Sequence, residues 1–448
     1  MHQPLSVTMV GTGYVGLVTG VCLAELGATV TCVDKETRKI DALCHGHIPI
    51  YEPGLQEVMA ENKARLTFTT QFTMAVKKAD IIFIAVGTPT DETTGEADLT
   101  YVFQAAEEIG RALEDYAVIV TKSTVPVGTN RRIKEIMSKV TDIPFDVASN
   151  PEFLREGSAV YDFMNPDRII IGTETAKAQD IMTRLYDPLC DDGVPRLRTG
   201  LETAEMIKYG ANAFLATKIG FINALADLCE VTGADVRDVA KGMGMDKRIG
   251  RAFLNPGPGY GGSCFPKDTL ALKKTAENYG APLAILDQVI ATNDARKKQM
   301  AKRIEAACGG NLSGKTIGVL GLTFKANTDD TRESPAMEIV AQLLQEKAIV
   351  QAFDPKGGAP AQQELPTLQI MSHPEEVANN ADVLVILTEW AEFVSLDYTK
   401  MAGAMKKESS PLLDCRNLLD ATKAVAYGFD YHPLGYVPFT EITQQQAA

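Results

Sequence analysis

A single cysteine stands in a glycine-rich run at residues 259–268, Gly-Tyr-Gly-Gly-Ser-Cys-Phe-Pro-Lys-Asp. The glycines leave the backbone free to approach a ligand closely, and Pro266 suits the first turn of a helix predicted over 268–274. The dipole of that helix, with Lys267 nearby, favours the nucleophilic thiolate form of Cys264. The alternative is an ordinary loop with an inert buried cysteine. The pattern favours a reactive thiol.

A second chemical pattern lies near the start of the chain, where residues 11–16 read Gly-x-Gly-x-x-Gly. A strand predicted over 6–10, a helix over about 17–26 and a strand over 28–33 give this pattern the context of a dinucleotide fingerprint. Asp34 follows 23 positions after the first glycine, where an acid binds a ribose 2′-hydroxyl and rejects a 2′-phosphate. The sequence therefore predicts NAD rather than NADP. The alternative is a βαβ unit without a ligand, in which Asp34 serves the turn.

Three more buried parallel strands are predicted, over 80–86, 117–121 and 145–148. In doubly wound sheets, ligands lie beyond the carboxyl ends of the strands, so the loop after each strand is expected to border the nicotinamide. Two of these loops carry hydroxyl groups, on Thr88 and Thr124. The residues alone leave open whether these hydroxyls face the cofactor or make plain turn hydrogen bonds.

Composition excludes several classes of function. The formal net charge is −14, from 44 basic and 58 acidic residues, which argues against broad binding of nucleic acids or membrane surfaces. The 8 cysteines form no CxxC pair, as in a reducing cytosol rather than a disulfide framework or a zinc site. No signal peptide precedes the first strand, and no apolar run approaches the roughly 20 residues of a membrane span. We therefore expect a cytoplasmic protein that captures anionic ligands locally.

The length of 448 residues favours two or three domains. A long apolar helix is predicted over 201–231, with Lys208 and Asn212 one turn apart on it. Such a helix must be covered by other elements, so we expect a homodimer. The alternative for Lys208 is an ordinary surface lysine. A second α/β unit is predicted from strands over 316–320, 348–354, 381–387 and 411–414 and a helix over 334–345. The expected fold is α/β, with two Rossmann-like doubly wound domains joined by a long central helix, over 1–200, 201–310 and 311–448.

Together these motifs resemble the UDP-glucose/GDP-mannose dehydrogenase family, whose members are NAD-dependent nucleotide-sugar dehydrogenases, over nearly the whole chain. The matching segments are 11–17, 51–55, 87–89, 123–129, 150–157, 248–268, 321–325 and 330–335. The segment 248–268 is especially similar to the members that act on UDP-glucose. Relatives that act on GDP-mannose or a UDP-N-acetylhexosamine usually differ just upstream of the cysteine. No motif departs from the family at a catalytic position.

The resemblance implies a metal-free four-electron oxidation of UDP-glucose to UDP-glucuronate with two NAD⁺. The catalytic residues that it implies are Cys264, Lys208, Asn212, Asp268, Glu152 and Thr124. Cys264 would form a thiohemiacetal and then a thioester, while Lys208 and Asn212 would steady the developing alkoxide. Asp268 would position or deprotonate water, and Glu152 and Thr124 would manage protons. Without the resemblance, the alternative for Asp268 is an acid that complements a helix dipole, and the alternative for Glu152 and Glu156 is a solvent-exposed position beside a polar turn.

The resemblance also names the residues that bind the two ligands. For NAD they are Gly11, Gly13, Val15, Gly16, Asp34, Lys39, Thr88, Thr124, Glu156, Lys267 and Arg332. For the sugar nucleotide they are Glu152, Phe153, Leu154, Arg155, Glu156, Lys208, Asn212, Phe253, Leu254, Asn255, Pro256, Gly257, Gly261 and Lys325. Because Arg332 belongs to the C-terminal domain, its contact with the cofactor would mean that domain closure completes the site. No nucleic acid, membrane or metal is expected as a partner.

Three other functions stay open. The same mechanism would serve GDP-mannose or a UDP-N-acetylhexosamine. A non-catalytic nucleotide-sugar sensor would keep the fold, but the intact set of Cys264, Lys208, Asn212 and Asp268 argues against it. A two-electron hydroxyacid dehydrogenase would leave the cysteine and the second α/β domain without a role.

Overall fold

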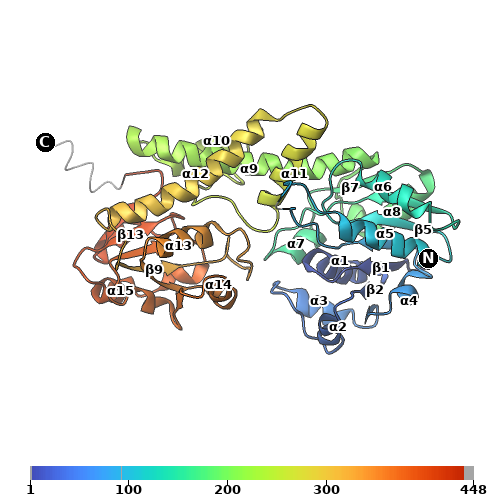
Figure 1. Cartoon of the computed structure of the whole chain (residues 1–448), viewed down its shortest axis with the longest axis horizontal. Helices are drawn as coiled ribbons and strands as arrows, with labels where there is room; N and C mark the ends of the chain where they lie inside the picture. The colour runs from blue at the N-terminus through green and yellow to red at the C-terminus, as the bar shows by residue number, and fades with distance from the viewer. Residues whose placement is uncertain (1–2, 92, 438–448) are drawn as a thin grey trace. The chain divides into compact units, whose positions relative to one another are not determined.

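The structure is a computed structural model that describes residues 3–91 and 93–437. The chain divides into two compact units. The first comprises Met1–Ala211 and Leu270–Pro282, and the second comprises Asn212–Thr269 and Leu283–Ala448. Each unit contains its own β-sheet with helices packed against it (Figure 1).

The first unit is built on a sheet in the order β3-β2-β1-β4-β5-β6-β7-β8. Its strands are β1 (Ser6–Val10), β2 (Thr29–Val33), β3 (Leu66–Thr69), β4 (Ile81–Ile84), β5 (Ala117–Thr121), β6 (Phe145–Ser149), β7 (Ile169–Thr173) and β8 (Arg196–Thr199). Neighbouring strands pair parallel except β6 and β7, which pair antiparallel. From β3 to β6 the spatial order is third, second, first, fourth, fifth, sixth, which is the order of dinucleotide-binding folds.

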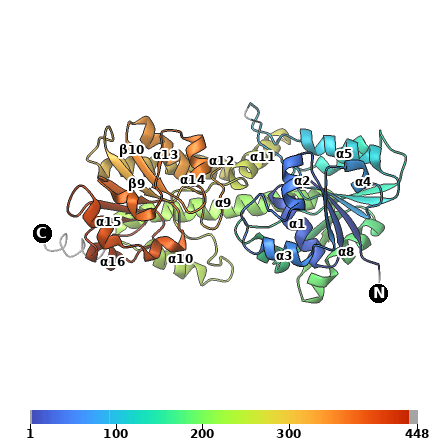
Figure 2. The same cartoon turned by 90° about the horizontal axis from the view of Figure 1, so that it is seen from below.

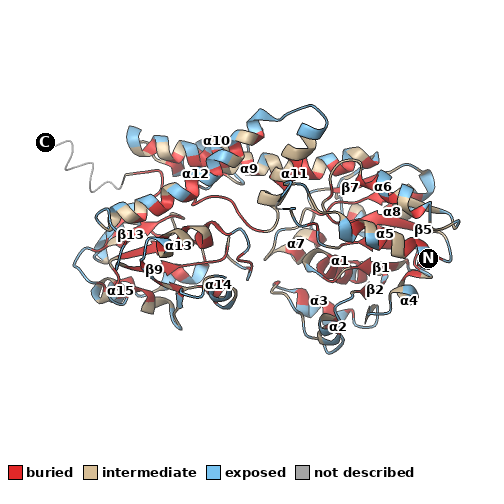
Figure 3. Cartoon of the chain, in the orientation of Figure 1, coloured by how far each residue is buried: buried red, intermediate tan, exposed pale blue. Residues whose placement is uncertain are grey.

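Helices cover both faces of this sheet. They are α1 (Tyr14–Glu25), α2 (Thr37–Cys44), α3 (Leu55–Glu61), α4 (Phe72–Val76), α5 (Thr100–Ala112), α6 (Thr129–Met137), α7 (Ala159–Met164) and α8 (Ala176–Asp191). On β4, Ile81 and Phe83 join the core with α1 and α8, whereas Ile82 and Ile84 join the core with α5 and α6. Because successive side chains point to opposite faces, a strand covered on both sides is apolar throughout. Figure 3 shows the central strands β1 and β5 of this sheet as buried.

The second unit repeats the same strand order in a six-stranded sheet, β11-β10-β9-β12-β13-β14. All of its strand pairs are parallel. The strands are β9 (Thr316–Leu320), β10 (Ile349–Phe353), β11 (Gln369–Ile370), β12 (Val383–Ile386), β13 (Pro411–Asp414) and β14 (Asp430–Pro433). One face packs against α12 (Ala284–Ala307) and α13 (Pro335–Gln345). The other face packs against η1 (Pro374–Ala378), η2 (Ala391–Ser395), α15 (Tyr398–Ala404) and α16 (Ala421–Ala426).

Two helices run across the division between the units. Helix α9 (Leu201–Thr232) has 32 residues, and α11 (Phe265–Asn278) begins directly after Cys264. In the second unit, α12 lies along α9 (Figures 1 and 2) and is joined to it by ion pairs of Arg296 and Arg303. Helix α10 (Val236–Gly244) follows α9, and α14 (Gly358–Glu364) follows β10. Within the described ranges, no helix is both long enough and apolar enough to cross a membrane.

The predicted fold class is confirmed, since both sheets are doubly wound and a long central helix is present. Two predicted helix starts were too late. Helix α1 begins at Tyr14 rather than Leu17, because Gly13 already serves as its N-cap. Helix α11 begins at Phe265 rather than Asp268, which places Pro266 in its first turn. The predicted domain boundaries near 200 and 310 stay predictions.

Candidate active site

The turn between β1 and α1 fits a dinucleotide pyrophosphate. Gly11 has φ +102°, and a Cβ there would lie 2.6 Å from the carbonyl oxygen of Ala85. A Cβ on Gly16 would lie 2.1 Å from the carbonyl oxygen of Gly11, so α1 packs onto the turn only with glycine there. At Gly13 a Cβ would meet nothing within 4 Å. The turn is therefore open beside the helix N-terminus, where backbone N–H groups favour an anion.

Asp34 follows β2 and holds this turn. Its carboxylate accepts hydrogen bonds from the backbone N–H and the hydroxyl of Thr12, both at 2.8 Å, and from the N–H of Glu36 at 3.0 Å. Burial raises the pKa of Asp34, but these hydrogen bonds outweigh burial and hold the pKa below its usual value. Lys39 pairs with Glu36 at 2.7 Å. Asp34 thus serves the turn, and its contact with a ribose stays a prediction.

The loops after β4 and β5 are tied together by hydroxyl groups. Thr88 donates a hydrogen bond to the carbonyl oxygen of Thr124 at 3.1 Å. Ser123 donates to the carbonyl oxygen of Val86 at 2.6 Å. The Thr88 hydroxyl therefore makes the turn hydrogen bond that the sequence left open. Val15, on the first turn of α1, is half-buried.

A buried ion pair lies beyond the carboxyl end of β6. Lys208 on α9 binds Glu152 with Nζ and Oε1 2.8 Å apart, and the two side chains are 4% and 5% exposed. The backbone N–H of Leu154 also donates to Glu152. Burial raises the pKa of Glu152, but the attraction and hydrogen bond of Lys208, that N–H and the charge of Lys122 together hold it below its usual value. The alternative in which Glu152 is solvent-exposed is excluded, because its carboxylate is buried against the ammonium group of Lys208.

The loop that follows Glu152 carries further predicted substrate contacts. The ring of Phe153 lies 5.5 Å from the ammonium group of Lys208. Arg155 forms two hydrogen bonds with Asp162, at 2.9 and 2.6 Å, and its side chain is 57% exposed. Leu154 and Glu156 are half-buried. The loop therefore presents both apolar and charged groups next to the buried pair.

Glu52 anchors this loop to the cofactor turn. Its carboxylate accepts hydrogen bonds from the backbone N–H groups of Gly157 and Ala159, both at 2.7 Å. The hydroxyl of Tyr14, on the first turn of α1, also donates to Glu52. The segment 51–55 was recognised as a motif without an assigned role, and its acid joins the first turn of α1 to the loop that follows Glu152.

Two further buried groups of the first unit escaped the sequence analysis. Lys122, directly after β5, donates to Asn150 at 3.0 Å, and burial lowers its pKa to about 8. Glu205, three residues before Lys208 on α9, accepts hydrogen bonds from the N–H groups of Gly128 and Asn130 at the start of α6. Burial raises the pKa of Glu205. The sequence signal for Glu205 is a charge between the apolar residues Ala204 and Met206, whereas Lys122 lies between Thr121 and Ser123 and gives no such signal.

The cysteine site lies in the second unit. Cys264 is half-buried, and its carbonyl oxygen accepts a hydrogen bond from the backbone N–H of Asp268 at 2.8 Å. The Asp268 carboxylate is 1% exposed and bound on both oxygens, by Asn212 at 2.6 Å and by Lys267 at 2.5 Å. Asp268 thus does more than complement a helix dipole. Because Lys267 pairs with Asp268, the positive charge of Lys267 is partly offset.

The glycines before Cys264 permit close packing against protein. A Cβ on Gly261 would lie 2.0 Å from the carbonyl oxygen of Glu333, and a Cβ on Gly262 would lie 2.8 Å from the ring of Phe324. The loop therefore rests on the segment that follows β9. Lys325 belongs to the same segment and is half-buried, with Nζ 5.6 Å from the ring of Phe324.

Polar side chains of α9 and α12 hold the predicted sugar loop at 253–257. Asn223 accepts a hydrogen bond from the N–H of Gly257 at 2.8 Å, and Arg296 donates to its carbonyl oxygen at 3.1 Å. Phe253 has φ +63°, a left-handed conformation that costs a non-glycine residue about 1 kcal/mol or more. Its ring centroid lies 6.0 Å from that of Phe265, next to Cys264. Leu254 and Pro256 are buried, and Asn255 is exposed.

Asn293, also on α12, was missed by the sequence analysis. Its side chain pairs with both backbone groups of Tyr260, accepting from the N–H at 2.8 Å and donating to the carbonyl oxygen at 3.0 Å. Arg332 pairs with Asp330 at 2.7 Å and its side chain is 68% exposed. Its contact with the cofactor stays a prediction.

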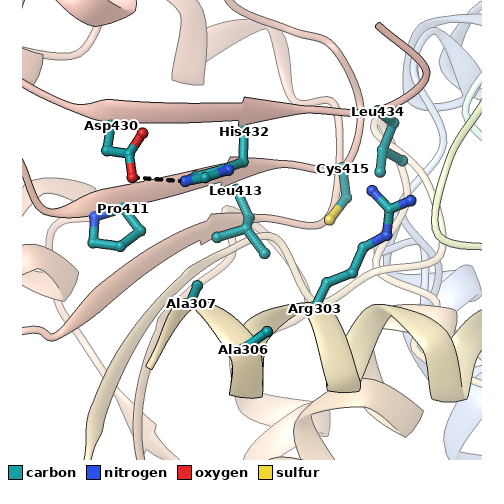
Figure 4. A pocket seen from close by; sticks show the side chains of 9 residues that line it. All are labelled: Arg303, Ala306, Ala307, Pro411, Leu413, Cys415, Asp430, His432 and Leu434. Carbon is teal, nitrogen blue, oxygen red and sulfur yellow. Dashed lines mark hydrogen bonds and ion pairs between the residues drawn. The ribbon is translucent and has the colours of Figure 1, made fainter. Parts of the chain in front are cut away.

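A cavity of about 450 Å³ lies elsewhere in the second unit, between α12 and strands β13 and β14 (Figure 4). Among its lining residues, His432 pairs with Asp430 at 2.9 Å, and Arg303 is engaged by Glu230 at 2.6 Å. None of the predicted site residues lines it. The cavity is therefore separate from the residues predicted for catalysis and ligand binding.

A sheet in the dinucleotide-binding order with a Gly-x-Gly-x-x-Gly turn defines the first unit as that of a Rossmann-type dehydrogenase. Three family models match the chain: the NAD binding domain over 5–190, the central domain over 202–295 and the UDP binding domain over 318–421 of UDP-glucose/GDP-mannose dehydrogenases. The chain belongs to the UDP-glucose/GDP-mannose dehydrogenase family. It is accordingly an NAD-dependent oxidoreductase of nucleotide sugars.

Individual relatives agree with this assignment. UDP-glucose 6-dehydrogenase of Rhizobium meliloti is 49% identical over 96% of this chain and 99% of its own length. A UDP-glucose dehydrogenase structure from Pyrobaculum islandicum has a TM-score of 0.90 at 36% identity, covering 97% of this chain and 98% of that one. A UDP-D-ManNAc dehydrogenase from Pyrococcus horikoshii has a TM-score of 0.84 at 25% identity, covering 96% and 99%.

Proposed function

We propose that this protein oxidises the 6-hydroxymethyl group of UDP-glucose to the carboxylate of UDP-glucuronate. The structural observation that carries the proposal is the buried Asp268, bound by Asn212 and Lys267 on the same helical turn as Cys264. Such a pairing supplies a thiol for covalent chemistry and an acid to direct water. The identity of 49% to a protein named UDP-glucose 6-dehydrogenase supports this choice of sugar.

The reaction balances as two oxidations and one hydrolysis. NAD⁺, held at the glycine turn of residues 11–16 and by Asp34, would supply the hydride acceptor for both oxidations at C6 of the sugar. In the first, Glu152 takes the hydroxyl proton through water, with the help of Thr124, while Lys208 and Asn212 steady the oxygen as the aldehyde forms. The sulfur of Cys264 then adds to the aldehyde carbon as a thiohemiacetal, and the second oxidation makes a thioester. Water directed by Asp268 breaks the C–S bond and releases the carboxylate.

The binding roles follow the division of residues predicted from the sequence. We assign NAD to residues 1–200 and the uridine diphosphate to 311–448, where Lys325 supplies a positive charge. Arg332 is assigned to the cofactor, and the loops at 152–156 and 253–257 are assigned to the sugar nucleotide. A cytoplasmic location is also proposed.

A second candidate is the same chemistry on another nucleotide sugar. The likeness to the UDP-D-ManNAc dehydrogenase structure supports it, because that structure has a TM-score of 0.84. Identity favours UDP-glucose, since the structure of a UDP-glucose dehydrogenase is 36% identical and that of the UDP-D-ManNAc enzyme is 25% identical.

The test is the amount of NADH formed per sugar consumed, with a chelator present. We expect two NADH per UDP-glucose and UDP-glucuronate as the product. One NADH per sugar would contradict the four-electron reaction. Turnover of GDP-mannose or a UDP-N-acetylhexosamine, with none of UDP-glucose, would support the same reaction but contradict UDP-glucose as the substrate.

The proposed homodimer rests on an apolar stripe along α9. Phe214, Phe221 and Leu228 recur every seven residues and are 65%, 53% and 54% exposed. Val231 extends the stripe at 81% exposure. A seven-residue apolar repeat is the seam along which two helices pack. A second copy of this chain would cover these side chains.

We therefore expect Phe221→Asp to convert a dimer into a monomer at micromolar concentration, because the seam would then bury a carboxylate among apolar side chains. Sedimentation velocity measures the change directly. Val394→Asp, which adds the same charge at an apolar side chain that is 55% exposed on η2, should remain dimeric. Wild-type protein that sediments as a monomer would contradict the proposal.

A further inference from the structure

Lys122 is a buried cation to which the proposed mechanism gives no role. It follows β5 and is 4% exposed. Its ammonium group donates to the side-chain oxygen of Asn150 at 3.0 Å and lies 3.4 Å from the hydroxyl of Tyr186. Both partners are neutral, so the charge is compensated by groups that it does not touch. A buried charge is retained only where its surroundings favour it.

The compensating charge is that of Glu152. Four elements bring titratable groups together here: Lys122 after β5, Glu152 after β6, Tyr186 on α8 and Lys208 on α9. Among the described residues, Glu152 attracts the charge on Lys122 and Lys208 repels it, while burial raises the pKa of Tyr186 and keeps that hydroxyl neutral. Glu152 is thus held by two cations, Lys208 in contact and Lys122 nearby.

Lys122 also fixes the backbone that carries Glu152. The oxygen of the Asn150 side chain accepts hydrogen bonds from Lys122 at 3.0 Å and from Tyr186 at 2.6 Å. Its amide group donates to the carbonyl oxygen of Ile170 on β7 at 2.8 Å. The side chain of Asn150, two residues before Glu152, is therefore held through both its oxygen and its nitrogen.

We propose that Lys122 is a positioning residue for the oxidation. It keeps Glu152 ionised and fixes the loop that carries Glu152. The inference rests on the proposed function, because Glu152 is there the group that takes the hydroxyl proton through water. A proton acceptor must be deprotonated before the reaction begins. A second cation nearby keeps it so at lower pH than Lys208 alone would.

Lys122→Met is therefore expected to move the acid limb of the pH profile of kcat upward by about one pH unit, because a nearby opposite charge changes a carboxyl pKa by about 1 to 3 units. Methionine keeps the length of the apolar stem. Lys122→Gln is the second variant, which keeps a donor for Asn150 if the packing of methionine prevents folding. Lys134→Met is the matched control, since Lys134 is 45% exposed and pairs with Glu174 at 2.9 Å.

A purely structural role would lower the amplitude of the profile and leave the limb where it is in the wild type. That result in a folded Lys122 variant would overturn the inference. If the wild type turns over UDP-glucose and the limb does not move, the inference fails and the proposed function stands. If the wild type oxidises none of the three nucleotide sugars, the proposed function fails, and a measurement without turnover is needed.

Urea unfolding supplies that measurement. The folded pKa of Lys122 is lowered from 10.5 to about 8, so the unfolded chain binds more protons between these values. The free energy of unfolding of the wild type should therefore rise relative to Lys122→Met as the pH increases from 8 to 10.5. A difference that stays constant over this range would overturn the picture of a buried, charged Lys122.

Discussion

A Cys264→Ser variant is expected to lose net oxidation of UDP-glucose by a factor on the order of 10³ or more, because a hydroxyl replaces the only proposed nucleophile. The first oxidation does not require the thiol, so bound aldehyde and one NADH per active site should still form. Any adduct that serine forms would persist, because an oxygen ester resists hydrolysis more than a thioester does. Stopped-flow absorbance separates the initial burst from the steady state, and the mass of the protein reports an adduct.

The remaining cysteines provide the control for this prediction. Burial raises the pKa of Cys22, Cys32 and Cys415 to about 12 and of Cys308 to about 11, so these groups stay protonated thiols near neutral pH. Cys308→Ser, at the end of α12, should retain wild-type turnover. Normal steady-state turnover in Cys264→Ser, or an equal loss in Cys308→Ser, would contradict the thioester scheme.

The strands that the sequence predicted well are those buried on both faces. β1, β5 and β13 lie at or within a residue of their predicted bounds because continuous apolar runs between turn residues have few other folds. Helix α12 was missed, although it has 24 residues. Its buried positions include Asn293, Arg296 and Lys297, so the apolar periodicity that predicts a helix is interrupted where the helix packs.

The residues of the candidate site also divide into those that sequence spacing indicated and those that it did not. Sequence spacing indicated the glycine turn and Cys264, because their chemistry depends on residues that are close in the chain. The partner of Lys208 is 56 residues away, and no periodicity connects Lys208 with Glu152. Lys122 and Asn150, 28 residues apart, meet only because β5 and β6 are neighbours in the sheet. Contacts of this kind depend on strand order, which a single sequence does not reveal.

Replacing Lys208 of the buried Lys208–Glu152 pair by methionine is expected to have a large effect on both turnover and stability. Turnover should fall about 10²- to 10³-fold, the usual loss when a donor to a developing oxyanion is removed. Stability should also fall, because Glu152 would remain buried without the cation with which it forms an ion pair. Breaking a buried pair on one side costs roughly 3–5 kcal/mol. Steady-state kinetics and urea unfolding measure the two losses separately.

The loss of stability should depend on pH in a direction set by Glu152. In the wild type the folded pKa of Glu152 is lowered, so its stabilisation is present above the unfolded pKa and is lost as the pH falls through the folded value. In Lys208→Met burial is expected to dominate and to raise the folded pKa above the unfolded one. The variant should then be least destabilised, relative to the wild type, at acidic pH below the folded pKa of Glu152 in the wild type, where this carboxyl is protonated in both proteins. The deficit should grow as the pH rises to neutrality, because Glu152 then has to ionise in a buried position.

The double variant Glu152→Gln/Lys208→Met separates the two roles of Lys208. Removing the carboxylate removes the uncompensated charge, so the double variant should regain part of the stability that Lys208→Met loses near neutral pH, and its pH dependence should flatten. Turnover should not return, because neither the cation nor the proton acceptor is present. A deficit in Lys208→Met that is equal at acidic and neutral pH would contradict the uncompensated carboxylate. Recovery of turnover in the double variant would show that Lys208 and Glu152 have no role in the oxidation itself and serve only the stability of the fold.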